Sequence, residues 1–316
     1  MRLIYSLAWW FALPPVLLRL FVRGRKEPGY RLHIAERLGF YGGVPYDGKT
    51  PLLWVHAVSV GETRAAQPLI DALLAAYPTH QLLLTHMTPT GRATGKDLFG
   101  KQPRVLQSFL PYDTGWMVGR FLRAFQPRIC VLMETEVWPN VMAQCTRYDV
   151  PVALVNARLS ERSLKKALKF PSLFVEAAAA MSCVAAQTES DAQRVKQLGA
   201  PDVHVTGSIK FDVTPPAEML QRGALLRAQF GQRKVLACAN TRDGEETLIL
   251  DALLAVNRPD ILLMIVPRHP QRFDDVAQMV RARGLSLARR STAGNTSLDA
   301  DVRVFLGDSM GEMFAY

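Results

Sequence analysis

Residues 52–85 read LLWVHAVSVGETRAAQPLIDALLAAYPTHQLLLT, and they contain two apolar runs separated by a helical pattern. The runs Leu52–Val58 and Gln81–Thr85 have the length and composition of buried β-strands. Between them, Arg64–Tyr77 places apolar side chains three and four positions apart, as on one face of a helix. A strand, a helix and a second strand in this order predict a parallel sheet covered by helices.

The same alternation continues along the chain. Further strands are expected at Val105–Phe109, Arg128–Met133, Val152–Val155, Cys183–Gln187, Val203–Thr206, Val235–Ala239, Ile261–Val266, Leu285–Ala288 and Val302–Leu306. A chain of 316 residues is long enough for two domains, each with its own core. The turn-rich segment Thr206–Pro216 predicts the boundary between them, and residues 291–301 are expected to form an exposed loop.

These patterns predict an α/β protein with two Rossmann-like, doubly wound domains. The expected domains are residues 27–206 and residues 207–316, after a separate N-terminal segment of residues 1–26.

The N-terminal segment is mostly apolar and is about long enough to cross a bilayer as a helix. Pro14 and Pro15 are expected to interrupt its helical hydrogen bonding. Trp9 and Trp10 are of the kind enriched at membrane interfaces, and a basic cluster follows that favours the cytoplasmic side and anionic headgroups. The cluster comprises Arg23, Arg25, Lys26, Arg31 and Arg37. We expect a membrane-associated helix rather than a cleaved signal peptide; the alternative is an apolar helix packed on the body of the protein.

The composition is globular and basic. Apolar residues make up 49% and charged residues 21%, and 38 Lys and Arg against 28 Asp and Glu give a net charge of +10. Such an excess favours nucleic acid, phosphorylated substrates or an acidic membrane surface. Nucleic acid is the weakest of these, because no basic patch is interleaved with aromatic residues. We therefore expect no nucleic-acid partner.

The sequence shows no metal-ligand or cofactor motif. Its four cysteines have no metal-ligand spacing and lie mostly in apolar runs, so they are expected to be buried, reduced thiols. The histidines are scattered, and a Walker loop, a GxGxxG turn after a strand and a GxSxG elbow are missing. We expect neither a metal nor a cofactor.

Polar segments follow most of the expected strands, where open α/β sheets bind their ligands. Glu62 begins a helix, whose dipole stabilises a carboxylate, so we expect it to be ionised at pH 7 and able to accept a proton from a hydroxyl. The alternative is an acidic capping residue. Glu134 and Glu136 both face the cleft if the chain stays extended. If the chain turns, one faces the cleft and the other caps a helix or binds a basic partner; a third alternative has both capping.

Two basic residues also lie in polar segments that follow expected strands. Lys210 lies in the expected linker, where it could reach a ligand held between the domains; the alternative is a solvated lysine. Arg268 follows the apolar strand ILLMIV, and its planar fork suits a phosphate. The alternative for Arg268 is a salt bridge at a helix start.

Read together, these segments resemble the 3-deoxy-D-manno-octulosonic acid (Kdo) transferases of lipopolysaccharide assembly. The resemblance extends over nearly the whole chain and keeps the expected order. It rests on the segments RGRK, ERLGFYGG, HAVSVGET, THMTPTGR, FLPYD, METEVWPN, NARLSERS, AAQTESDAQR, GSIKFD, VPRHPQRF and GDSMGEM.

The resemblance implies two Rossmann-like domains of the GT-B type with the active site in the cleft. It implies CMP-Kdo as donor and a lipid A precursor (lipid IVA) as acceptor, at the cytoplasmic face of the inner membrane and among its lipids. CMP is displaced at the anomeric carbon with inversion, without a required metal. Glu62 matches the general base, and Glu134 and Lys210 match residues that stabilise the transition state. The positions that match CMP-binding segments are Pro267, Arg268, Met310, Gly311 and Glu312.

Two departures from the family pattern bear on the donor site. Asn240-Thr241-Arg242-Asp243 stands where the family has Ser or Thr and His before Gly-Glu-Glu. The sequence also ends at Tyr316, before the family's glycine-rich loop and Asn-Pro-Leu-Glu segment. The second domain is therefore expected to be incomplete, and the 316 residues alone to have little transferase activity.

Two rival functions are kept open. One is a GT-B glycosyltransferase that uses a UDP-sugar, which a donor-nucleotide binding screen would separate from a Kdo transferase. The other is a non-catalytic, membrane-surface remnant of the same fold.

Overall fold

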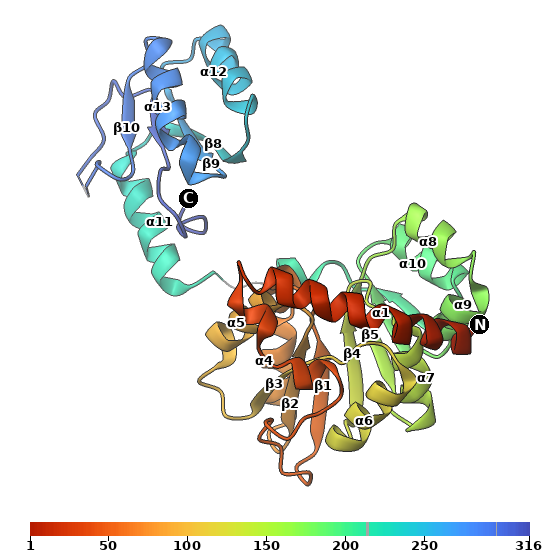
Figure 1. Ribbon diagram of the computed structural model, residues 1–316. Helices are drawn as coiled ribbons and strands as arrows, with labels where there is room; N and C mark the ends of the chain where they lie inside the picture. The colour runs from red at the N-terminus through yellow and green to blue at the C-terminus, as the bar shows by residue number, and fades with distance from the viewer. Residues whose placement is uncertain (213–214, 295) are drawn as a thin grey trace. The chain divides into compact units, whose positions relative to one another are not determined.

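A computed structural model describes residues 1–212, 215–294 and 296–316 (Figure 1). The chain divides into two compact units, residues 1–213 and 214–316, and each is described by itself. Val213 and Thr214, within the expected boundary segment, lie outside the described residues, as does Asn295 in the expected loop.

Unit 1 contains a seven-stranded parallel sheet in the order β3-β2-β1-β4-β5-β6-β7. Its strands are β1 (Leu52–His56), β2 (Gln81–His86), β3 (Val105–Phe109), β4 (Ile129–Met133), β5 (Val152–Ala157), β6 (Cys183–Ala186) and β7 (Val203–Val205). Every strand expected in this part of the sequence is present, with ends that differ by no more than a few residues. The strands β2 and β3 lie on one side of β1, and β4 to β7 follow on its other side. This strand order is that of a Rossmann-like domain.

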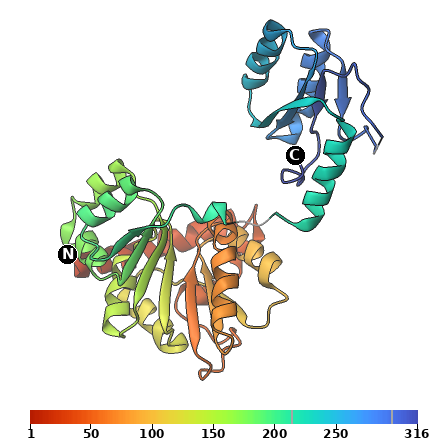
Figure 2. The same cartoon turned by 180° about the vertical axis from the view of Figure 1, so that it is seen from behind.

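Helices cover both faces of this sheet. They are α1 (Arg2–Arg23), α2 (Ile34–Arg37), α3 (Val60–Ala65), α4 (Gln67–Ala76), α5 (Pro89–Phe99), α6 (Gly115–Phe125), α7 (Pro139–Arg147), α8 (Glu161–Ala167), α9 (Pro171–Ala179) and α10 (Glu189–Gln197), with 3₁₀ turns η1 (Pro28–Arg31) and η2 (Ile209–Phe211). Alternate strand residues face opposite sides: Trp54 and Leu83 pack with α6 and α7, whereas Val55 and Leu84 pack with α3 and α4. Figures 1 and 2 show the sheet from its two sides.

Two helix predictions were wrong in detail. The single helix expected at Arg64–Tyr77 is two helices, because α3 ends at Ala65 and α4 begins at Gln67 with Pro68 in its first turn. Proline has no N–H to donate to the preceding turn, so it starts a new helix readily. Conversely, α1 runs unbroken through Pro14 and Pro15, whose fixed φ is compatible with a helix.

Unit 2 has a four-stranded parallel sheet in the order β10-β11-β9-β8. Its elements are α11 (Ala217–Gln229), β8 (Lys234–Thr241), α12 (Glu245–Val256), β9 (Ile261–Pro267), η3 (Pro270–Arg272), α13 (Phe273–Ala282), β10 (Leu287–Arg289) and β11 (Val304–Leu306). Leu263 and Ile265 pack against α12 and α13, whereas Leu262 and Met264 pack against α11. Residues 291–294 and 296–301 belong to no helix or strand and are mostly exposed, as the sequence predicts.

Candidate active site

Three polar segments of unit 1 follow strands at the same edge of the sheet. Ser59–Glu62 follows β1, residues 134–140 follow the adjacent strand β4, and η2 follows β7. Parallel strands end on one side, so these segments gather at the carboxyl edge of the sheet.

Glu62 is the third residue of α3, and its side chain is 9% exposed. Its Oε1 accepts a hydrogen bond from Ser59 Oγ and its Oε2 accepts one from the Val58 N–H, both at 2.9 Å. Ser59 Oγ in turn accepts from the Glu62 N–H at 3.5 Å, an arrangement that resembles a capping box but uses the N–H of Val58 instead of that of Ser59. Each carboxylate oxygen still has an unused lone pair, so capping the helix does not prevent Glu62 from accepting a proton.

The pKa of Glu62 is raised, and burial is the main cause. The hydrogen bonds from Val58 and Ser59 act in the opposite direction, while the charge of Glu134 adds to the rise. Burial therefore outweighs the stabilisation of the carboxylate that the helix start was expected to provide. A raised pKa brings a carboxylate closer to what a general base needs near neutral pH.

Glu134 has a left-handed backbone, with φ of 59°, although it is not a glycine. Such a conformation costs on the order of 1 kcal/mol and is concentrated at functional sites. Its Oε1 lies 4.0 Å from Nζ of Lys210, whose side chain is 62% exposed. The chain therefore turns at Glu134, and this residue meets a basic partner, one of the alternatives that the sequence leaves open.

Glu136 is largely buried, and its pKa is raised to about 7. Burial is the main cause, followed by the negative charges of Glu62 and Glu134. The neighbouring Trp138 side chain acts in the opposite direction. Glu62 and Glu134 thus lie close enough to Glu136 to raise its proton affinity.

Neither Glu134 nor Glu136 caps the helix that follows them. Asp113 performs that role: its Oδ2 accepts from the Asn140 N–H at 3.0 Å and its Oδ1 from the Val141 N–H at 2.8 Å. The capping alternative for the two glutamates is therefore wrong, because a residue from another loop already occupies the start of α7.

Asn156, the first residue of the segment NARLSERS, is a site residue to which the sequence reasoning gave no role. It lies at a bulge in β5, is 3% exposed and has a left-handed φ of 53°. Its Oδ1 accepts from the Ile209 N–H at 3.3 Å, while its buried Nδ2 has no partner among the described residues. Asn156 thereby fixes η2, which carries Lys210, to the strand beside β4. An asparagine at a strand end, where left-handed backbone is tolerated, is the signal that could have identified it.

The residues expected to contact CMP lie in unit 2, at the carboxyl ends of the adjacent strands β9 and β11. Pro267 ends β9, and Arg268 is exposed, with its backbone N–H donated to Thr241 O at 3.0 Å. The Arg268 guanidinium has no hydrogen bond or ion pair within the described part of the chain. Met310 is 66% exposed, and Gly311 has a φ of 79° that favours glycine.

Glu312 is already fully engaged. Its carboxylate accepts hydrogen bonds from Arg222 at 3.0 Å, from two nitrogens of Arg290 at 3.1 Å and from Ser309 Oγ. These partners outweigh its burial and lower its pKa to about 2. A contact between Glu312 and CMP would have to replace one of them, so in this state Glu312 holds two arginines in place.

The loop in which the sequence departs from the family pattern is tied to its own unit. Asn240 forms a left-handed bulge at the end of β8, and Thr241 Oγ1 donates to Oε1 of the buried Glu246 at 2.8 Å. Arg272 pairs with Glu246 at 2.9 Å and also with Asp243. This loop therefore has an internal structural role. Across residues 1–212, 215–294 and 296–316, no group of His, Cys, Asp and Glu could hold a metal ion.

The fold matches that of known enzymes of nucleotide-sugar chemistry. UDP-GlcNAc 2-epimerase from Neisseria meningitidis, solved with UDP-GlcNAc, aligns with a TM-score of 0.53 over 82% of this chain and 72% of its own, at 13% identity. A likeness at this identity shows the fold alone, and it confirms the predicted α/β fold class of the GT-B type. The chain thus has an α/β fold of this architecture, with carboxylates at the edge of one parallel sheet and arginines at the edge of the other.

The family is shown by sequence. Residues 32–213 match the family described as 3-Deoxy-D-manno-octulosonic-acid transferase (kdotransferase). The chain is 42% identical to the 3-deoxy-D-manno-octulosonic acid transferase of Bordetella pertussis, over 100% of this chain and 75% of that protein. It is 37% identical to the Haemophilus influenzae enzyme, over 99% and 73%. The chain belongs to the Kdo transferase family and is a glycosyltransferase, as the resemblance in its sequence predicts.

Proposed function

We propose that this protein transfers Kdo from CMP-Kdo to a lipid A precursor, lipid IVA, with inversion at the anomeric carbon. The observation that supports this most directly is the buried Glu62 at the carboxyl edge of the first sheet, with a raised pKa and free lone pairs. We further propose that the reaction takes place at the cytoplasmic face of the inner membrane, because the apolar α1 is followed by a basic segment.

The reaction is a single displacement. The acceptor hydroxyl loses its proton to Glu62 as its oxygen bonds to the anomeric carbon of Kdo. The bond from that carbon to the phosphate oxygen of CMP breaks, and its electron pair leaves with CMP. Attack on one face and departure from the other invert the configuration. The Lys210 ammonium, oriented by Glu134, supplies positive charge for the transition state.

The donor is proposed to bind unit 2. Arg268 is suited to the phosphate of CMP, since its guanidinium is exposed and has no competing carboxylate among the described residues. Pro267 shapes the same strand end, and Met310, Gly311 and Glu312 form the neighbouring turn after β11. Glu312 acts there by holding Arg222 and Arg290.

A second carboxyl group competes with Glu62 for the role of base. The pKa of Glu136 is raised to about 7, which is close to the optimum for proton transfer at neutral pH. Glu62 is favoured because a helix start and two hydrogen bonds fix its orientation, which proton transfer requires.

The test is to incubate the purified enzyme, in a form that also contains the family's glycine-rich loop and Asn-Pro-Leu-Glu segment, with CMP-Kdo and tetraacylated lipid A precursor and to measure the product by mass. We expect a mass gain of one or more Kdo residues, with release of CMP. The 316 residues alone are expected to give little product. Parallel reactions with UDP-sugars test the rival donor class. Binding of UDP but not CMP, or transfer only from a UDP-sugar, would contradict the proposed function.

A further inference from the structure

The helix α1 has one face packed on the body of unit 1. Leu13 and Leu20 are buried, and Trp9 stacks on Tyr112 with ring centroids 5.6 Å apart. These side chains follow the period of a helix and meet a small apolar cluster of the body. The cluster comprises Tyr30, Leu38, Met87, Tyr112 and Met117.

Two polar side chains of α1 reinforce this contact. The Tyr5 hydroxyl donates to Asp113 Oδ2 at 2.9 Å, and Asn140 Nδ2 donates to Ser6 Oγ at 3.1 Å. Asp113 and Asn140 are 1% and 4% exposed. If α1 left the body to cross a bilayer, these bonds would be lost and two hydroxyls would enter hydrocarbon, where unpaired polar groups are costly.

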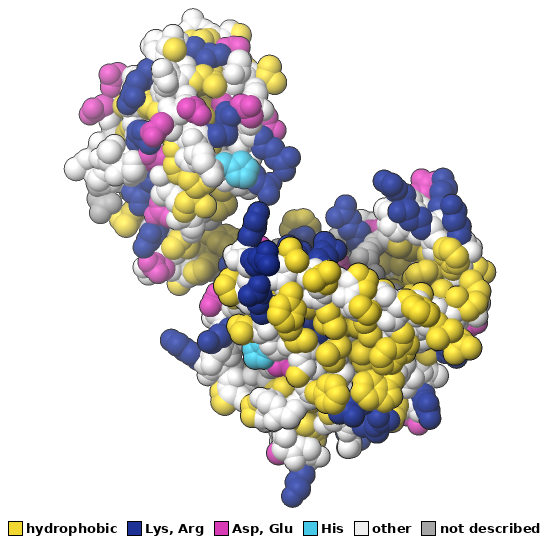
Figure 3. All heavy atoms as spheres, viewed as in Figure 1, with side chains coloured by type: hydrophobic (Ala, Val, Ile, Leu, Met, Phe, Trp, Pro, Cys, Tyr) yellow, Lys and Arg dark blue, Asp and Glu magenta, His cyan; other side chains and the backbone are white. Residues whose placement is uncertain are grey.

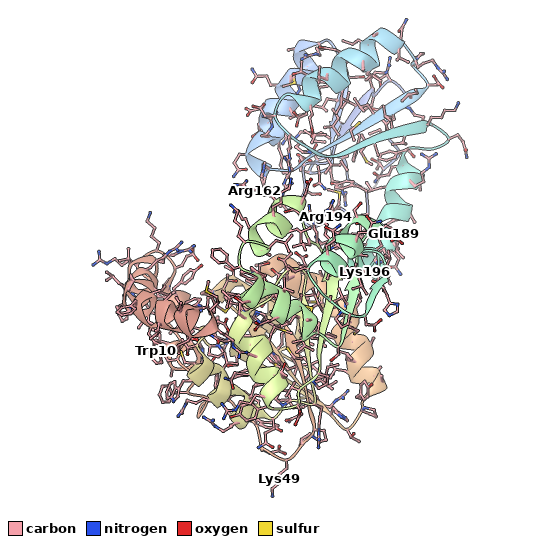
Figure 4. The ribbon with its side chains drawn as sticks, turned by 90° about the vertical axis from the view of Figure 1, so that its right-hand side faces the viewer. Trp10, Lys49, Arg162, Glu189, Arg194 and Lys196 are labelled. Carbon is pink, nitrogen blue, oxygen red and sulfur yellow. The ribbon has the colours of Figure 1, made fainter. Side chains whose placement is uncertain are left out.

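The outer face of α1 is apolar as well. It exposes Leu3, Ile4, Leu7, Trp10, Phe11, Leu18, Phe21 and Val22. Figure 3 shows an extended hydrophobic surface on this side of unit 1, and Figure 4 labels Trp10 on α1. A helix that is apolar on all sides needs cover on all sides, and the body covers only one.

The apolar surface continues from the helix onto the body. Trp116 of α6 lies 6.4 Å from Trp10 between ring centroids, and Phe40 lies 6.1 Å from Trp116. Arg120 stacks on both body rings, at 4.4 Å from Phe40 and 5.0 Å from Trp116. Amphipathic aromatic rings beside an arginine are typical of the boundary between headgroups and acyl chains.

The charges around this surface indicate which kind of partner it binds. Residues 1–26 contain no Asp or Glu but carry Arg2, Arg19, Arg23, Arg25 and Lys26. A second copy of the chain would present the same cations, with no acidic residue in this segment to meet them. Anionic lipid headgroups meet all of them, at roughly 1 kcal/mol for each cation near the surface.

We propose that α1, Trp116 and Phe40 form one rigid bilayer-binding face, and that α1 lies in the plane of a single leaflet without crossing the membrane. The outer face would enter the headgroup and acyl boundary by roughly 5–10 Å. This inference refines the proposed membrane location and does not depend on Kdo transfer.

The first experiment measures depth with vesicles of phosphatidylethanolamine and phosphatidylglycerol whose acyl chains carry bromine near the headgroup or near the bilayer centre. Trp10→Phe and Trp116→Phe should each remove part of the fluorescence quenching by shallow bromines. Trp9→Phe, on the inner face, is the matched control and should remove little. If Trp9 and Trp10 were quenched equally and most strongly by the deep bromines, and Trp116 were not quenched, the helix would span the bilayer and the proposal would be overturned.

The second experiment measures affinity for the same vesicles by sedimentation, without CMP-Kdo. Phe11→Glu, at a side chain 82% exposed, should weaken binding about tenfold or more, because a buried phenylalanine is replaced by a charge. Leu248→Glu, at an exposed residue of unit 2, should leave it unchanged. Equal effects of the two substitutions would contradict the proposal, as would lipid-free dimers that Phe11→Glu dissociates. A failure of Kdo transfer alone would leave this result standing.

Discussion

Replacing Glu62 with glutamine should separate its two roles, because the amide can cap a helix but cannot take up a proton at neutral pH. General-base catalysis typically contributes about 10²–10⁴-fold, so Glu62→Gln should lower turnover by at least about 100-fold. The affinity for CMP should change little, since the proposed donor contacts belong to unit 2.

The same substitution should leave stability nearly unchanged. Glutamine also serves in a capping box, so its carbonyl can keep the hydrogen bond from Val58 or Ser59. The sign of the charge effect follows from the raised pKa of Glu62. The native state disfavours the carboxylate relative to the unfolded state, so a neutral side chain removes a destabilising contribution at pH 7. We expect the free energy of unfolding to stay the same or rise slightly.

Ser59→Ala is the matched control. It removes the hydroxyl that caps α3 but keeps the carboxyl group, so it should cost about 1 kcal/mol of stability. Its turnover should fall far less than that of Glu62→Gln. Urea unfolding and single-turnover transfer from CMP-Kdo measure the two quantities. A loss in turnover smaller than roughly tenfold for Glu62→Gln would leave it as a capping residue and place the base elsewhere.

Three further predictions concern other residues to which a role is proposed. Asn156→Ala should release the loop that carries Lys210 and lower kcat at least tenfold, with little change in the KM for CMP-Kdo. Asn156→Asp keeps the Oδ1 acceptor and should restore part of the lost kcat. An unchanged kcat would contradict this positioning role. Glu136 binds its proton more tightly in the folded state, so the free energy of unfolding should fall as pH rises from about 4.5 to about 7, and Glu136→Gln should flatten this slope in urea titrations. Arg268→Ala should weaken CMP binding by calorimetry, whereas Lys210→Ala mainly slows turnover; equal CMP affinity in both variants would count against the assignment.

The strands could be predicted because parallel strands buried on both faces read as uninterrupted apolar runs, as in Ile129–Met133. Helix boundaries were harder to predict from the sequence. The apolar periodicity of the first crossover continues across Pro68, and so the break between α3 and α4 left no mark in that pattern. The unbroken course of α1 through two prolines is possible because the fixed φ of proline is helical, and the expectation of a break gave too much weight to the missing N–H groups.

The site was predictable in its residue types but not in its electrostatics. Glu62 and Glu134 could be proposed because each lies in a polar segment that follows a strand. The pKa of Glu136 depends on burial by neighbouring elements and on the charge of Glu62, which lies in the helix after another strand. The contact between Asn156 and Ile209 joins residues far apart in the sequence and depends on a bulge that no local pattern indicates.

Asp113 binds both the proposed membrane helix α1 and the start of α7, which follows the loop with Glu134 and Glu136. Asp113 accepts a hydrogen bond from Tyr5 of α1 with the same carboxylate that binds the N–H groups of Asn140 and Val141 at the start of α7. Residues 134–138, directly before α7, contain Glu134 and Glu136. Removing residues 1–26 would therefore disturb this loop as well as membrane binding, because it would take away the partner of a buried carboxylate. Substitutions on the outer face of α1 change the lipid contact and leave Asp113 paired. Their effect on turnover can therefore show whether the bilayer only anchors the enzyme or also keeps its carboxylates in position.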